Sequence, residues 1–166
     1  MDDGIQIIMK SPFVKDADSE EGFFWSIEVN DPATNRTIEA SISPYALLHS
    51  LGEEQGEQDL FTCGCGVAEC ARIYHEKFAC TEKYVCWSFV ELGIAYSLCF
   101  DRIAYEIGAI EMLYDIYVSK KGWKFNAIEY YSYDDFKSAV DEFLASKPHF
   151  KAIWDEIDNE KEKVKP

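Results

Sequence analysis

The chain has 166 residues, of which 48% are hydrophobic and 15% aromatic, enough to form the core of one domain without cross-links. Its formal net charge of −15 argues against a nucleic-acid partner, and no apolar run approaches the roughly 18 residues that a membrane span requires. The chain begins with acidic residues rather than with the basic and then apolar residues of a secretory signal. We therefore expect a cytoplasmic protein with reduced thiols and no membrane partner.

The first third of the chain has the residue pattern of a half-buried antiparallel sheet. Residues 23–29 are rich in aromatic and β-branched side chains, and residues 36–42 alternate between apolar and polar ones. The Asn, Asp and Pro residues between these segments favour a turn. Ser43 and Pro44 then predict the start of a short helix, because serine caps free N–H groups and proline fits the first helical position.

After an acidic loop at 53–59 the strand pattern returns and later changes to helical spacing. Residues 72–79 and 84–90 flank a hairpin loop, and alternation resumes over 94–100. Beyond Asp101, which is available as a helix cap, apolar residues recur three or four positions apart. The later part of the chain is predicted to contain three helices, at 102–118, 133–145 and 148–158, and one further strand at 123–131.

The order of these elements, strands first and helices later, favours the α+β class over a parallel sheet. We expect an antiparallel β-sheet of six to eight strands with the C-terminal helices packed on one face. No repeat, linker or low-complexity segment divides the sequence, so residues 1–166 are predicted to form a single domain. The charged tail at 159–166 is expected to fray.

Acidic side chains are concentrated in the first 59 residues, which carry 13 acidic and 3 basic side chains. They are densest in segments 16–21 and 53–59, both predicted as loops. A surface of this kind attracts basic proteins and speeds their association, although excess acid also simply keeps a protein soluble. The candidate partner-binding residues are Asp16, Asp18, Glu20, Glu21, Glu53, Glu54, Glu57 and Asp59.

A cysteine cluster begins at Cys63 and continues with Cys65 and Cys70, and His75 follows as a possible fourth metal ligand. Zinc requires four such ligands, but they usually come in C-x2-C pairs rather than in the C-x-C spacing seen here. Packing of small buried thiols beneath a tight turn is the simpler interpretation, and a zinc site or a redox role are the alternatives. The remaining cysteines fall in predicted strands or hairpins and are assigned to packing alone: Cys80, Cys86 and Cys99.

No set of residues fills the roles of an active site. The phosphate-binding loop, the dinucleotide-binding glycine motif and the H-E-x-x-H zinc motif are all absent from the sequence. Neighbouring carboxylates at 53–54 and 134–135 are explained by solvation and by helix capping. We therefore predict a protein that is not an enzyme.

The segment Cys63-Gly64-Cys65-Gly66, followed by Cys70 and by a hairpin that carries Trp87, resembles a motif in small bacterial proteins. In size, acidity and lack of catalytic motifs the chain also resembles immunity proteins of bacterial polymorphic-toxin and contact-dependent growth inhibition systems. That resemblance implies a toxin inhibitor that neutralises a cognate, basic nuclease domain through protein–protein interaction. A small zinc-binding or redox protein built on the cysteine cluster, or a regulatory or scaffold domain without a toxin partner, are the alternatives.

Overall fold

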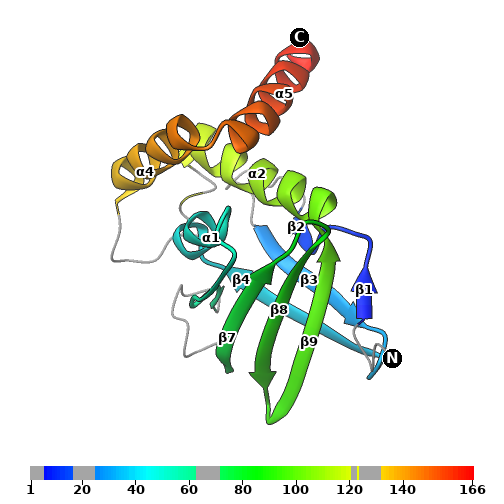
Figure 1. The fold of residues 1–166 in the computed structure, drawn as a ribbon. Helices are drawn as coiled ribbons and strands as arrows, with labels where there is room; N and C mark the ends of the chain where they lie inside the picture. The colour runs from blue at the N-terminus through cyan, green and yellow to red at the C-terminus, as the bar shows by residue number, and fades with distance from the viewer. Residues whose placement is uncertain (1–5, 17–24, 63–71, 121–122, 124–131) are drawn as a thin grey trace.

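The computed structural model describes residues 6–16, 25–62, 72–120, 123 and 132–166, whose strands form two sheets (Figure 1). The five-stranded sheet consists, in spatial order, of β1 (Gln6–Ile8), β9 (Ile94–Asp101), β8 (Tyr84–Glu91), β7 (Ile73–Cys80) and β5 (Gln55–Glu57). The four-stranded sheet consists of β2 (Phe13–Lys15), β3 (Trp25–Asp31), β4 (Arg36–Ile42) and β6 (Phe61–Thr62). The helices are α1 (Pro44–Ser50), α2 (Arg102–Val118), α4 (Tyr133–Ser146) and α5 (Pro148–Val164).

The predicted α+β class is confirmed, but the strands form two sheets of five and four strands instead of one sheet of six to eight. Strand pairs are antiparallel except for β1 and β9, which run parallel. Alternation in a sequence predicts that each strand has one buried face, but not what covers that face. Here the two sheets cover each other, and the longer helices lie across one end of the pair (Figure 1).

The hydrophobic core lies between the two sheets and beneath α2. Trp87 of β8 is 1% exposed and lies at its centre. Its ring centroid is 5.1 Å from that of Phe61 on β6 and 5.5 Å from that of Tyr105 on α2, both in edge-to-face geometry. The ring centroid of Phe13 on β2 is 6.4 Å from that of the same indole, also in edge-to-face geometry. Both sheets and α2 therefore share one core, in which aromatic pairs add to the stabilisation from burial.

The hairpin formed by β8 and β9 carries a disulfide bond. It turns at Leu92 and Gly93, whose φ angles of 50° and 80° match the mirror-image turns that suit the twist of two paired strands. The resulting register places Cys86 directly opposite Cys99, with their Cα atoms 4.0 Å apart, and the two sulfurs are bonded. The expectation that these two cysteines are reduced and serve packing alone is therefore wrong.

The three long helices begin where the sequence predicts. The Asp101 side chain accepts a hydrogen bond from the Ala104 N–H at the start of α2, and the Ser132 side chain accepts one from the Asp135 N–H at the start of α4. In the strand predicted at 123–131, residues 124–131 lie outside the described part of the chain, and Trp123 itself is helical and buried. Of the described helices, none has the length and apolarity that crossing a membrane requires.

The charged tail at 159–166, which was expected to fray, instead forms the last turns of α5, which ends at Val164. Two contacts with α2 explain this difference. The Tyr114 hydroxyl donates a 2.5 Å hydrogen bond to Asp158, and Lys161 forms an ion pair with the buried carboxylate of Asp115. Because the tail supplies a cation that a buried anion on α2 requires, its charge favours order rather than fraying.

Candidate partner-binding surface

The acidic segment 53–59 was predicted as a loop, but the structure places an edge strand within it. Gly52, with a φ of 82°, turns the chain after α1, and β5 then pairs with β7. The carbonyl of Glu54 extends this attachment by accepting a 2.6 Å hydrogen bond from the Cys80 N–H. The acidic side chains therefore extend from a backbone that is held by the five-stranded sheet.

All the candidate side chains in this segment are exposed: Glu53, Glu54, Glu57 and Asp59. Two of them form ion pairs. A Glu57 carboxylate oxygen is 3.4 Å from the Lys77 ammonium group, and a Glu53 oxygen is 4.0 Å from that of Lys147. Exposed pairs of this kind stabilise a protein by at most about 1 kcal/mol, so a partner can displace them at little cost.

Of the other acidic segment, residues 16–21, the structure describes only Asp16, and this residue lies away from the segment 53–59. Asp16 is exposed and directly follows β2. The strands β2 and β6 form the two opposite edges of the four-stranded sheet. The β6 edge is the one next to β7, because Phe61 of β6 hydrogen-bonds to Glu76 of β7. Asp18, Glu20 and Glu21 lie outside the described residues. The structure therefore groups the candidates at 53–59 and places Asp16 at a distant edge.

Glu76, which the sequence analysis missed, lies behind the acidic segment. The register of β7 against β8 shifts between Tyr74 and Lys77, which marks a β-bulge. This irregularity turns Glu76 inward, where it is only 8% exposed. One of its carboxyl oxygens accepts a 2.7 Å hydrogen bond from the backbone N–H of Phe61.

A signal for this bulge is present in the sequence. Ile73 and Phe78 are both buried although they are five positions apart, and a regular strand places residues with an odd separation on opposite faces. One extra residue between them restores the alternation, and Glu76 lies in that interval. Strand periodicity predicts such an interruption only when both flanking residues are known to face inward.

The buried position changes the acidity of Glu76. Desolvation raises the pKa of its carboxyl from 4.5 to about 8, because burial disfavours the charged form. Hydrogen bonds from the backbone N–H groups of Phe61 and Leu60 lower the pKa, while the negative charge of Asp59 raises it further. Glu76 is therefore protonated at neutral pH and becomes an anion only at mildly alkaline pH or when a positive charge approaches it.

Glu76 and the acidic segment line an open groove of about 520 Å³. Its lining residues are Glu57, Gln58, Asp59, Glu76 and Lys77. With Glu76 protonated, the carboxylates of Glu57 and Asp59 still outnumber the ammonium group of Lys77, so the groove attracts cationic groups. A lysine or arginine side chain that enters it would pair with the exposed carboxylates and would favour the ionised form of Glu76.

The zinc prediction cannot be placed on the described residues. Cys63, Cys65 and Cys70 lie outside them, and His75 belongs to β7 at the bulge. Within the ranges that the structure describes, no group of three or more His, Cys, Asp or Glu side chains is arranged to hold a metal ion. A metal site at the cysteine cluster therefore remains a prediction.

A second buried carboxyl group, on α2, belongs to a histidine-containing cluster. Glu106 is 2.8 Å from the Arg102 guanidinium nitrogen and 2.6 Å from the His149 ring nitrogen. The cavity beside it, which Cys80 also lines, has a volume of only about 10 Å³. That volume suits at most one water molecule, and burial raises the pKa of the Cys80 thiol and so keeps it protonated. The cluster therefore joins α5 to α2 and has no room for a substrate.

No protein-family model, no curated protein and no solved structure gives a significant match to this chain. A functional assignment therefore depends on the chain's own charge distribution and geometry.

Proposed function

We propose that the protein is a stoichiometric inhibitor of the immunity type, which binds a basic toxin domain in the bacterial cytoplasm through the acidic surface at residues 53–59. One observation carries the proposal: exposed carboxylates flank an edge strand and an open groove, which the buried carboxyl group of Glu76 also lines. Nuclease domains carry basic clefts for nucleic acid, and a protein with this surface would cover such a cleft. Long-range attraction between the two surfaces would speed their association.

The backbone of β5 supports the same proposal. Among the strands that the structure describes, β5 pairs only with β7 and forms the edge of its sheet. An edge strand offers unpaired N–H and C=O groups to an extended segment of a partner. A basic extended segment would therefore gain backbone hydrogen bonds along β5 and place a cationic side chain in the adjacent groove.

The experiment begins with tagged protein incubated with lysate of its native organism, at low and then at high salt, to isolate the partner. Association kinetics are then measured for the variant E53Q/E54Q/E57Q/D59N. We expect its association rate at low salt to fall by about tenfold or more and its salt dependence to weaken, because steering depends on these charges. Its equilibrium affinity should fall as well.

The control variant, D155N/E156Q/E160Q/E162Q, removes the same number of exposed charges from the later turns of α5, which extend away from both sheets (Figure 1). It should retain most of the wild-type association rate. Equal effects of the two variants would mean that net charge alone matters and would refute a binding surface at β5. Failure to retain a basic partner at either salt concentration would argue against the inhibitor function itself.

A further inference from the structure

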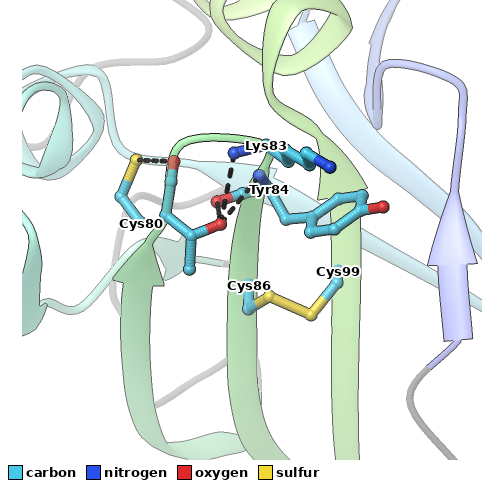
Figure 2. The surroundings of a disulfide bond; sticks show 6 residues. Cys80, Lys83, Tyr84, Cys86 and Cys99 are labelled. Carbon is cyan, nitrogen blue, oxygen red and sulfur yellow. Dashed lines mark hydrogen bonds between the residues drawn. A yellow bond between two sulfur atoms is a disulfide. The ribbon is translucent and has the colours of Figure 1, made fainter. Parts of the chain in front are cut away.

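The outer face of the five-stranded sheet is open and carries the disulfide bond. In Figure 1, β7, β8 and β9 lie with this face toward the viewer, and no described helix covers it. Its central side chains are small and exposed, including Ala79, Ser88 and Ser97. The bond between Cys86 and Cys99 crosses the middle of this face, beside Tyr84 (Figure 2).

The two sulfurs of this bond differ in their surroundings. Cys99 is only 3% exposed, and its neighbour on the β1 side is the bulky Ile7. Cys86 is half-buried, and its neighbour on β7 is Ala79, whose methyl group leaves more space. An open groove of about 450 Å³, with Ala79 and Ser88 also in its lining, extends to Cys86. A small molecule can therefore approach the bond from the Cys86 side.

The sheet does not depend on this bond for its pairing. The cysteines are 13 positions apart within one hairpin, and eight residue pairs, from Tyr84↔Asp101 to Glu91↔Ile94, hold β8 against β9. Trp87, next to Cys86 on the opposite face, anchors β8 in the core. Cleavage of the disulfide therefore leaves the backbone ladder and the buried face of the hairpin in place.

We propose that the Cys86–Cys99 disulfide is a thiol-exchange site, at which a small-molecule monothiol enters the groove and forms a mixed disulfide with Cys86. The attacking thiolate bonds to the Cys86 sulfur as the bond to Cys99 breaks. The electron pair of that bond leaves with the Cys99 sulfur, which takes a proton from solvent. A second monothiol then attacks the mixed disulfide, releases the oxidised small-molecule disulfide and leaves both cysteines reduced.

The groove that leads to Cys86 borders the acidic surface, because Glu57 and Lys77 line both this groove and the acidic one, but the exchange reaction requires no toxin partner. Attack on a disulfide depends on which sulfur an incoming thiolate can reach, and here the accessible sulfur is that of Cys86. A shielded structural disulfide would persist in a thiol-rich compartment, whereas an accessible one follows the state of the thiol pool. The site thus gives the outer face of the sheet two chemical forms, an oxidised one and a reduced or thiolated one.

The test uses folded, full-length protein and reduced glutathione as the monothiol. Thiols that are already free are first blocked by alkylation, so that only the two cysteines of this disulfide can form an adduct. After acid quenching, cleavage at Glu91 separates the two cysteines for mass spectrometry. We expect the glutathione adduct on Cys86 and not on Cys99, at a rate that low urea concentrations do not change.

Two variants and one control test the route through the groove. A79I and S88V place larger side chains beside Cys86, and each should slow adduct formation by about tenfold, because access controls the rate of exchange. A95I adds the same bulk as A79I on the same open face, next to Val90 instead of Cys86, and should react at the wild-type rate. An adduct on Cys99, equal rates in all variants, or exchange no faster than global unfolding would each overturn the proposal.

Discussion

The helical end of the molecule and the bulge of β7 both bury carboxyl groups, but they neutralise them in different ways. On α2, the carboxylate of Asp115 pairs with Lys161 of α5 and, at 3.0 Å, with Lys15 of β2. At the bulge of β7, Glu76 accepts backbone hydrogen bonds instead and keeps its proton up to a pKa of about 8. A buried charge is tolerated when it is paired, and otherwise the group becomes neutral.

The consequences of the two arrangements differ. Ion pairs to Asp115 join three elements that are distant in sequence, so the charge contributes to tertiary structure. The proton on Glu76 leaves its side chain neutral until pH or a cation changes it. The helical end thus uses buried charge to hold elements together, and the bulge of β7 keeps a carboxyl group that can change its charge.

The largest expected effect is on the pH dependence of stability through Glu76. The unfolded carboxyl ionises near its ordinary pKa of 4.5, whereas the folded one keeps its proton to about 8. The unfolded state therefore binds fewer protons between these values, and the free energy of unfolding falls as pH rises through this window. Below pH 4.5 both states are protonated, and the penalty disappears.

The variant E76Q mimics the protonated carboxyl and should remove this slope. We expect E76Q to match the wild type near pH 4 and to exceed its stability by roughly 3–5 kcal/mol at pH 8, since each pKa unit corresponds to about 1.4 kcal/mol. Urea unfolding at a series of pH values measures this difference. E57Q, an exposed carboxyl in the same groove, should leave the slope unchanged, and parallel curves for E76Q and wild type would refute the assignment.

A smaller loss is expected when the buried charge of Asp115 loses its partners. The double variant K15M/K161M leaves this carboxylate without either ammonium group and should lower the free energy of unfolding by about 2–4 kcal/mol at neutral pH. Thermal or urea unfolding measures the loss. Adding D115N should restore most of it, because the uncompensated charge is then gone; a triple variant as unstable as the double one would point to lost packing instead.

The smallest effect is expected for an exposed ion pair in the same helical region. Lys151 and Asp155 lie one turn apart on α5, and both side chains are about half exposed. The variant K151M should change the free energy of unfolding by less than about 0.5 kcal/mol, since water screens the pair. A change as large as that of K15M/K161M, measured under the same conditions, would show that burial does not distinguish the two kinds of pair.

Local features of the fold could be predicted because their causes lie within a few residues. Asp101 and Ser132 cap the helices that follow them, as their positions before apolar helical repeats indicate. The exposed acids at 53–59 could also be predicted, because a segment with so few apolar side chains has little to bury. The Cys86–Cys99 disulfide was not predicted, because both thiols were expected to be reduced; only the register that the turn at Leu92 and Gly93 sets brings residue 86 opposite residue 99.

The sequence by itself therefore determined the α+β class, the three long helices and the acidic surface, through periodicity, capping and local charge. Only the tertiary structure decided that two sheets cover each other, that Glu76 is buried and that the tail of α5 is ordered. These outcomes depend on partners far away in the chain: Phe61 is 15 residues from Glu76, and Asp115 is 46 residues from Lys161. Local pattern shows that a side chain needs a partner, and the packed fold determines which residue meets that need.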